Sequence, residues 1–340
     1  MDLSIGTPCD PPSGAVVAAL ATSGTERGYP PSVGTAALRQ AAVGWMSRRL
    51  GVDVPVDAVA GCVGTKELVA TIPQWLRLRD PSRDTVLYPA VSYPTYQMGA
   101  LLARCRAVPV PVDEKWQLDL AQVDDTDAAR ALCLWVNTPS NPTGALDDLD
   151  AVAAWGRAHD IPVFSDECYV ELTWEGNRRT ILGGGFEGVV AVHSLSKRSN
   201  LAGLRAGFYT GDPEIVGYLA EVRKHVGMMM PGPVQAAAAV ALDDDASVDQ
   251  QRARYLERLA YLGAVLTEAG YPVALPGGGF YLWAKAPGGD AWAAAEDLAR
   301  RGGVVVSPGE LYGPQGRDRL RVAAVQPLER LRLVADRLLG

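Results

Sequence analysis

Histidine and cysteine are scarce in this sequence, which has three histidines and five cysteines in 340 residues. The cysteines are odd in number and form no CxxC pair, which excludes a disulfide framework and the usual zinc-binding spacings. The histidines form neither an HxxxH nor an HExxH pattern. We therefore expect no metal site.

Runs of positive charge are also absent. The chain has 32 Lys and Arg against 39 Asp and Glu, a net charge of −7, and no basic run is longer than two residues. Nucleic-acid binding depends on a basic surface that releases counter-ions, and anionic membranes attract the same kind of surface. We therefore expect no nucleic acid and no membrane as partners, and a small-molecule substrate instead.

Long apolar runs and a basic N-terminus are missing as well. Met1–Ser4 contains no basic residue, and the apolar run Ala15–Ala21 is too short for a membrane span. We expect no targeting segment and a cytoplasmic location. Prolines at positions 11, 12, 30 and 31 predict that the first thirty residues form a mostly extended arm.

The composition is that of a globular enzyme, with 48% hydrophobic and 21% charged residues, and the length predicts about two domains. In the middle of the chain, short apolar runs such as Leu132–Val136 alternate with helical patterns. A continuous apolar run is typical of a strand that is covered on both faces, and the alternation predicts a mostly parallel sheet. The expected strands are Thr85–Tyr88, Ala107–Pro111, Ala131–Val136, Pro162–Ser165, Val189–His193 and Gly207–Thr210, and the expected helices include Tyr93–Ala103, Asp147–Ala158 and Pro213–Val226.

The last third of the chain predicts a smaller α/β unit. It begins with a long helix, Asp249–Ala269, that has one charged face and one apolar stripe. The expected strands after it are Phe280–Lys285, Gly303–Val306 and Leu320–Ala323, and the further helices are Ala291–Arg301 and Leu328–Leu339. Two lobes and an arm are the predicted architecture.

Polar residues follow the expected strands of the larger unit. Asn141 lies directly after one strand, Asp166 ends the next, and Ser194–Lys197 follows a third, with Arg205 eight residues later. In open α/β sheets, ligands bind beyond the carboxyl ends of the strands. The joint placement of carboxylate, amide, hydroxyl, amine and guanidinium groups therefore predicts a binding site at this edge.

Three motifs identify the chain as similar to a known family: NPTG at 141–144, SDECY at 165–169 and SLSKRSNLAGLRAG at 194–207. Together they resemble the class I/II aminotransferases, which are fold-type-I enzymes dependent on pyridoxal 5′-phosphate. The resemblance covers nearly the whole chain. It implies an α/β fold with a large, mostly parallel seven-stranded sheet and a smaller α/β domain. The implied limits are an arm at 1–30, a large cofactor-binding domain at 31–235 and a small domain at 236–340.

The resemblance also implies which residues hold the cofactor ring. Lys197 resembles the lysine that binds the cofactor covalently and then moves a proton as general base and acid. Asp166 resembles the carboxylate that keeps the ring nitrogen protonated, so that the ring can act as an electron sink. Asn141 and Tyr169 resemble the donors to the phenolic oxygen, and Tyr93 resembles the aromatic residue that stacks on the ring.

The phosphate is expected at the start of the helix that follows Gly64, in the stretch Gly64-Thr65-Lys66, because a helix N-terminus suits an anion. The resemblance adds the Ser194 and Ser196 hydroxyls and the Arg205 guanidinium. It also implies that Tyr29 reaches the phosphate of a neighbouring subunit, which would make the enzyme a homodimer with shared active sites.

For the substrate, the resemblance implies that Arg321 grips the α-carboxylate, with Asn141 beside it and the backbone of Gly6 closing over it. Arg317 and Arg319 compete with Arg321 for this role. Arg319 and Arg321 lie on the same side of the expected strand, so alternation along the strand does not separate them.

The sequence specifies the substrate less closely than the cofactor. The stretches Arg223–His225, Pro231–Gln235 and Tyr281–Trp283 resemble the succinyldiaminopimelate transaminases of actinobacteria. These act in lysine biosynthesis, moving an amino group between glutamate and N-succinyl-2-amino-6-oxopimelate. A distal carboxylate on each substrate requires a cationic partner, and the sequence does not rank the candidates Arg27, Lys66 and Arg198.

Other functions stay open. The first is an aminotransferase of aspartate, alanine or aromatic specificity. A second is a pyridoxal-phosphate-dependent carbon–sulfur β-lyase, which would keep Lys197, Asp166 and Arg321. A non-enzymatic regulator on this fold usually has a fused DNA-binding domain, for which the thirty residues before the fold leave little room.

Overall fold

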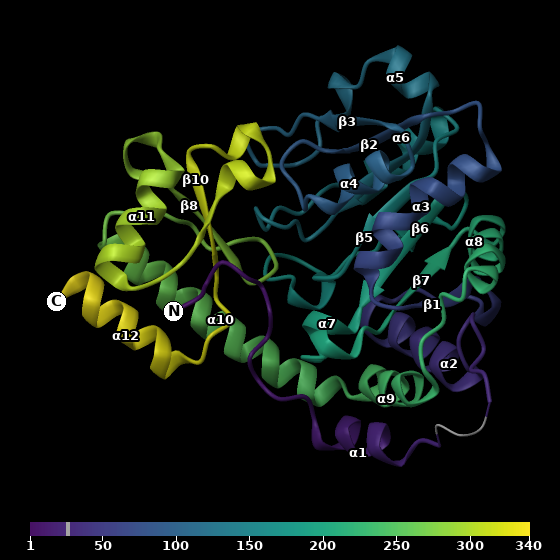
Figure 1. Ribbon diagram of the computed structural model, residues 1–340, viewed down its shortest axis with the longest axis horizontal. Coiled ribbons are helices and arrows are strands. Elements are labelled where there is room, and N and C mark those ends of the chain that lie inside the picture. The colour runs from purple at the N-terminus through teal and green to yellow at the C-terminus, as the bar shows by residue number, and fades with distance from the viewer. Residues whose placement is uncertain (25–27) are drawn as a thin grey trace.

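The protein's structure, a computed structural model, describes residues 1–24 and 28–340 and shows two lobes with an N-terminal arm between them (Figure 1). The large lobe contains a seven-stranded sheet in the order β1-β7-β6-β5-β4-β2-β3. Only β7 runs antiparallel to its neighbours; the other paired strands are parallel, as predicted. The strands are β1 (Val59–Cys62), β2 (Thr85–Pro89), β3 (Arg106–Val110), β4 (Ala131–Asn137), β5 (Val163–Asp166), β6 (Val189–Ser194) and β7 (Gly207–Gly211).

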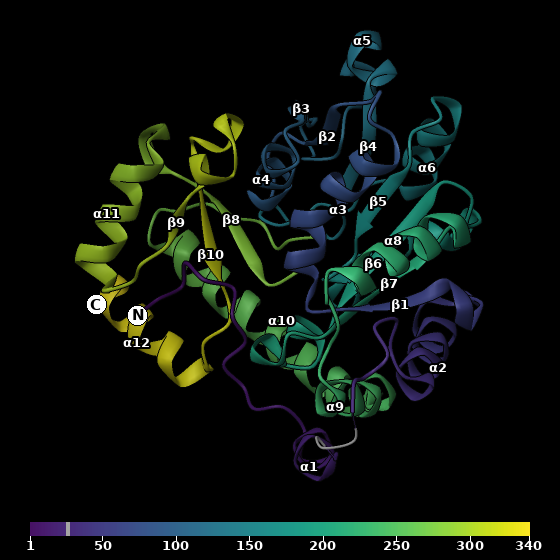
Figure 2. The same ribbon diagram turned by 45° about the vertical axis from the view of Figure 1, so that its right-hand side comes forward.

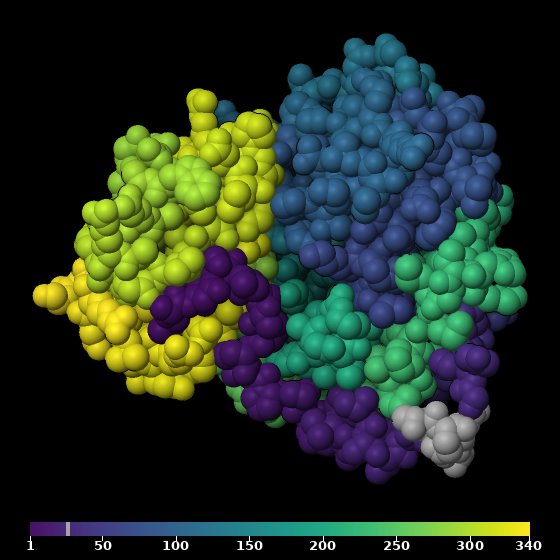
Figure 3. All heavy atoms as spheres, viewed as in Figure 1, coloured from purple at the N-terminus to yellow at the C-terminus, as the bar shows by residue number. Residues whose placement is uncertain are grey.

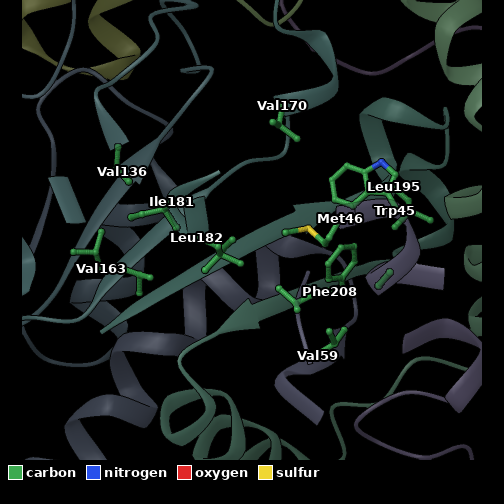
Figure 4. Close-up of a cluster of buried hydrophobic side chains, with 14 of the residues drawn as sticks. Trp45, Met46, Val59, Val136, Val163, Val170, Ile181, Leu182, Leu195 and Phe208 are labelled. Atoms are coloured by element: carbon green, nitrogen blue, oxygen red, sulfur yellow. The ribbon is translucent and has the colours of Figure 1, made fainter. Parts of the chain in front are cut away.

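Helices cover the two faces of this sheet (Figure 2). Successive side chains of β4 point to opposite faces: Leu134 packs in one hydrophobic core and Trp135 in the other. This is why the strand reads as continuously apolar. The core of Figure 4 lies on the first face, against α2, α6 and α9, while α3, α4 and α8 cover the second. These helices are α2 (Ala36–Trp45), α3 (Thr65–Arg79), α4 (Thr95–Leu102), α6 (Leu149–Ala158), α8 (Pro213–His225) and α9 (Gly232–Asp243), with the short α5 (Asp125–Ala129) and α7 (Leu195–Arg198) between strands.

The small lobe has an antiparallel sheet in the order β8-β10-β9, formed by β8 (Tyr281–Lys285), β9 (Ser307–Pro308) and β10 (Arg319–Ala323). Its helices are α10 (Asp245–Glu268), α11 (Ala291–Gly302) and α12 (Leu328–Leu339). Alternation along β8 places Leu282 and Ala284 in the core of the small lobe and leaves Tyr281 and Trp283 on the other face.

The structure corrects two of the expected elements. The strand expected at Gly303–Val306 is displaced, because Val305 instead exchanges backbone hydrogen bonds with the arm residues Met1 and Leu3. The arm is not extended throughout, because Gly14–Thr22 forms the helix α1, which packs against α9. Its sequence GAVVAALAT is rich in alanine, the strongest helix former, so the prolines at 11 and 12 only precede a helix.

Strand β1 was not predicted from the sequence, because it has only four residues, Val-Ala-Gly-Cys, and two of them are small residues that do not favour a strand. The implied limits at 30 and 235 stay predictions. Within the described part of the chain, no helix combines the length and the hydropathy that a membrane span requires.

Candidate active site

A cavity of about 650 Å³ lies between the two lobes, at the carboxyl ends of β4, β5 and β6. The space-filling view shows the surface hollowed beside the purple arm, where the two lobes meet (Figure 3). The cavity brings together most of the residues expected from the sequence: Gly6, Thr65, Lys66, Tyr93, Asn141, Asp166, Tyr169, Ser194, Ser196, Lys197, Arg205 and Arg321. We call it the central cavity.

Lys197 lies in α7, the short helix that follows β6. Its Nζ donates a hydrogen bond to the backbone carbonyl of Gly6 in the arm. Burial, with Arg321 and Arg205 close by, disfavours the ammonium form and lowers the pKa of Lys197 from 10.5 to about 8. An amine with this pKa is partly neutral near pH 7 and can act as a nucleophile.

Asp166 is the last residue of β5 and is buried. Its Oδ2 accepts a hydrogen bond from the Tyr96 hydroxyl at 2.8 Å, and its Oδ1 accepts one from the backbone N–H of Cys168 at 3.2 Å. Burial raises the pKa of Asp166. A positively charged ligand atom at this carboxylate would favour its ionised form.

The structure brings Arg321 and Asn141 together from opposite lobes. Arg321 Nη1 donates to Asn141 Oδ1 at 2.8 Å, and Nη2 donates to the backbone carbonyl of Ser4. The guanidinium lies between two aromatic faces, 4.2 Å from the ring centre of Tyr281 and 4.6 Å from that of Tyr312. These contacts hold the guanidinium plane fixed at the edge of the cavity.

Arg319, a competing candidate for the same role, points elsewhere. Its guanidinium stacks over Trp116 at 5.3 Å and lines a separate groove between the lobes. Among the two arginines of β10, Arg321 is therefore the one in the central cavity.

An anion-binding corner lies at the start of α3. Gly64 precedes the helix with a φ of 74°, and a Cβ there would collide with the guanidinium of Arg205. Glycine therefore allows Arg205 to lie directly over the helix N-terminus, where backbone N–H groups point outward. Ser194, the last residue of β6, and Ser196, in α7, line the same cavity. A guanidinium, two hydroxyls and a helix N-terminus are a suitable set for a phosphate.

Comparison with known proteins agrees with this geometry. The sequence profile described as "Aminotransferase class I and II" matches residues 1–338. The chain belongs to the class I and II aminotransferases.

Relatives of this aminotransferase differ in substrate. It is 42% identical to the 4-dedimethylamino-4-oxo-anhydrotetracycline transaminase OxyQ of Streptomyces rimosus, over 99% of this chain and 92% of OxyQ. It is 32% identical to the LL-diaminopimelate aminotransferase of Aquifex aeolicus, over 99% of this chain and 90% of that one. Among solved structures, a probable N-succinyldiaminopimelate aminotransferase of Thermus thermophilus is 32% identical, with a TM-score of 0.89 over 99% of this chain and 94% of that one.

Class I and II aminotransferases use pyridoxal phosphate, and the central cavity fits this cofactor. The corner at Gly64 and Arg205 suits its phosphate, the Lys197 amine suits its aldehyde, and the buried Asp166 carboxylate suits its ring nitrogen. All three groups line or border one cavity, as the cofactor requires.

Three tyrosines of this aminotransferase were not expected as site residues. Tyr96 contacts Asp166, while Tyr281 and Tyr312 enclose Arg321. No pattern in the sequence distinguishes Tyr96 and Tyr281 from core aromatics, because the residues that they hydrogen-bond lie far away in the chain. Tyr96 and Asp166 are 70 residues apart, and Tyr281 and Tyr169 are 112 residues apart.

The structure distinguishes the cationic residues that were candidates for binding a distal carboxylate of the substrate. Lys66 lines the central cavity, with its Nζ 5.9 Å from the ring centre of Tyr93. Arg198 is buried outside this cavity and donates to the carbonyl of Ala241 at 2.7 Å, so it is unsuited to the role. Arg27 lies outside the described residues.

Tyr29, which the resemblance places at the phosphate of a neighbouring subunit, is 97% exposed and does not line the cavity of its own chain.

Proposed function

We propose that this enzyme moves an amino group from an amino acid with a distal carboxylate to 2-oxoglutarate, which becomes glutamate, and catalyses the reverse reaction. N-succinyl-LL-2,6-diaminopimelate is the favoured amino-acid substrate. The observation that supports this most is Lys66. In our assignment, Lys197, Arg205 and Arg321 serve the cofactor and the α-carboxylate, and Lys66 is the further cation that lines the cavity. The proposed reaction is a step of lysine biosynthesis through diaminopimelate.

In this proposal each residue has one task. When bound, pyridoxal phosphate accepts electron density from the substrate α-carbon and so makes the α-proton acidic. Lys197 removes and returns that proton, since its lowered pKa suits proton transfer near pH 7. Asp166 holds the ring-nitrogen proton, and Asn141 and Tyr169 donate to the phenolic oxygen. Arg321 binds the α-carboxylate as a planar fork.

We also propose that the enzyme is a homodimer with shared sites. Tyr29 is fully exposed in the single chain, which is unusual for a tyrosine. Its hydroxyl would reach the phosphate in the partner's cavity, and Tyr93 would stack on the ring within its own chain.

A ring ketone is the second candidate for the amino acceptor. The relative OxyQ, at 42% identity, is named for a tetracycline intermediate. Such an acceptor carries no distal carboxylate equivalent to that of an acidic amino acid, so Lys66 would not decide its binding. A β-lyase activity on the same residues would release ammonia and a keto acid without a requirement for 2-oxoglutarate.

The test is a coupled assay of glutamate formation from 2-oxoglutarate with a panel of donors that includes N-succinyldiaminopimelate, LL-diaminopimelate, aspartate, alanine and phenylalanine. We expect the highest kcat/KM with N-succinyldiaminopimelate. Release of ammonia and a keto acid, without 2-oxoglutarate, from an amino acid that carries sulfur at Cβ would instead support the lyase. A preference for donors without a distal carboxylate would contradict the proposal.

Lys66→Met makes the specificity test sharper. We expect its KM to rise about tenfold or more for the acidic donors, as for loss of a charged partner, and to change little for alanine. Because Lys66 also lies near the expected phosphate site, the alanine measurement is the internal control. An equal rise for all donors would place Lys66 with the cofactor rather than with the distal carboxylate.

A further inference from the structure

Behind Tyr169 lies a second tyrosine hydroxyl, that of Tyr281. The two hydroxyl oxygens are 3.0 Å apart, and both side chains are buried. Tyr169 belongs to the large lobe and Tyr281 is the first residue of β8 in the small lobe (Figure 2). This hydrogen bond therefore joins the two lobes inside the central cavity.

The surroundings of Tyr281 hold it in place. Its ring packs edge-to-face with Tyr169, with ring centres 5.8 Å apart, and with Phe280, with ring centres 4.9 Å apart. Tyr255 belongs to the same apolar cluster and packs against Phe280. The Arg321 guanidinium covers its outer face at 4.2 Å. Its hydroxyl also occupies the space that a Cβ on Gly6 would need, so the arm can pass here only as glycine.

Each of the two hydroxyls has a single proton to donate. Burial raises the pKa of Tyr169 and of Tyr281, so both are neutral at physiological pH. The titratable or charged groups near the pair are Arg321, Cys168, Tyr93 and Tyr312, with the Lys197 amine in the same cavity. If Tyr169 donates to the phenolic oxygen of the cofactor, it has no proton left for Tyr281 and must accept one from it.

We propose that Tyr281 is a positioning residue that donates its hydroxyl proton to Tyr169 and thereby directs the Tyr169 hydroxyl toward the cofactor. An oxygen that accepts a hydrogen bond becomes a stronger donor through its own O–H, because successive hydrogen bonds polarise one another. Tyr281 thus strengthens a cofactor contact that it does not make itself. Because its ring also supports Arg321, one side chain links the α-carboxylate site to the cofactor ring.

This inference rests on the proposed role of Tyr169. The experiment uses the enzyme loaded with pyridoxal phosphate and measures the pH midpoint at which the visible absorption of the bound cofactor changes. A hydrogen bond to the phenolic oxygen stabilises its anionic form and lowers this midpoint. We expect Tyr169→Phe to raise the midpoint, and Tyr281→Phe to raise it by a smaller amount, about 0.5 pH unit.

The double variant distinguishes direct from indirect action. If Tyr281 acts through Tyr169, Tyr169→Phe/Tyr281→Phe has the midpoint of Tyr169→Phe alone. Tyr312→Phe is the matched control, because it also removes a hydroxyl from a ring stacked on Arg321 but contacts no hydroxyl of Tyr169; its midpoint should be that of the parent. The dissociation constant of pyridoxal phosphate from each variant is a second, activity-independent measurement, and we expect a rise of about two- to threefold for Tyr281→Phe.

Each outcome has one meaning. A Tyr281→Phe midpoint equal to that of the parent, while that of Tyr169→Phe is raised, overturns the inference and leaves the proposed function intact. Additive shifts in the double variant also overturn it, since Tyr281 would then act independently. An unchanged midpoint in Tyr169→Phe contradicts the proposed role of Tyr169 itself.

Discussion

The two halves of the central cavity are built in different ways. In the half proposed to hold the cofactor, here called the cofactor half, Thr65 and Lys197 follow β1 and β6, and Asp166 ends β5. These strands belong to one sheet, so backbone pairing sets the spacing of the three residues. In the substrate half, Arg321 and Tyr281 come from the small lobe, and Ser4 and Gly6 come from the arm. Segments more than 270 residues apart in the chain meet there, as Arg321 and Ser4 do.

The difference in construction predicts which kinetic quantity a substitution in each half will change. The cofactor half lies on a sheet that is buried on both faces, so its residues are held in one geometry. The substrate half depends on a few contacts between separate segments, among them the Arg321 bonds to Asn141 and to the arm. We therefore expect changes in the cofactor half to reduce turnover and changes in the substrate half to reduce affinity.

The largest effect is expected at Lys197. In the proposed mechanism, Lys197→Ala removes both the covalent attachment point and the proton carrier, so we expect turnover to fall by more than about 10³-fold. The side chain contributes little packing, so the thermal unfolding midpoint of the apoprotein should stay near that of the parent. Near-parental turnover in a correctly folded Lys197→Ala protein would show that the chemical centre lies elsewhere.

The next largest effect is expected at Asp166. Asp166→Asn keeps the shape of the side chain but loses the negative charge that we propose stabilises the ring-nitrogen proton. We expect kcat to fall about 10²-fold or more while pyridoxal phosphate stays bound. Asp166→Glu, which keeps the charge, is the matched comparison and should be milder. Steady-state kinetics with parallel absorption spectra check both. An Asn variant as active as the parent would mean that Asp166 is not the group that keeps the ring nitrogen protonated.

The same comparison explains what could be predicted from the sequence. The cofactor half was predictable because Asn141, Asp166 and Lys197 each lie within a few residues of a strand end, so short motifs record their placement. Arg321 was found by resemblance, yet only the structure separates it from Arg319, since the two lie on the same side of β10. Tyr96 and Tyr281 were missed because their contacts arise from packing between distant segments.

In the substrate half, Arg321→Lys tests affinity. A lysine cannot present two parallel N–H groups to a carboxylate, so we expect KM for amino donors to rise about 30-fold, with a smaller change in kcat. Arg319→Lys, in the same strand but outside the cavity, is the control and should keep a KM within about twofold of the parent value. A similar rise in the two variants would mean that the effect comes from β10 as a whole.

The two halves meet at Lys197, whose amine contacts the Gly6 carbonyl, and its titration gives a pH prediction. With a pKa of about 8, the neutral fraction of this amine falls about tenfold for each unit below pH 8 and levels off above it. We expect the rate of pyridoxal phosphate uptake by the apoprotein to follow this curve. A free lysine derivative, measured alongside, should level off about two units higher; a protein curve that coincides with it would contradict the lowered pKa.

The smallest effect is expected at Tyr29, which tests whether the cofactor half is complete within one chain. Its side chain is 97% exposed, and an exposed arm residue gains most by contacting a partner. If its hydroxyl donates to the phosphate in the neighbouring subunit, Tyr29→Phe should weaken retention of pyridoxal phosphate by up to about tenfold and leave the Lys197 chemistry unchanged. The measurement is the dissociation rate of the cofactor.

A mixture of Tyr29→Phe and Lys197→Ala proteins decides between action in the same chain and action across the interface. In a heterodimer with shared sites, one site combines Lys197 of the first chain with the intact Tyr29 of the second, and the other site lacks both. The first site should retain the cofactor as tightly as the parent, which neither homodimer does. The fraction of sites that retain the cofactor tightly should grow with subunit exchange, up to one of the two sites in each heterodimer. If exchange is confirmed by mass and no tight site forms, Tyr29 acts within its own chain or away from the phosphate, and the cofactor half then needs no partner.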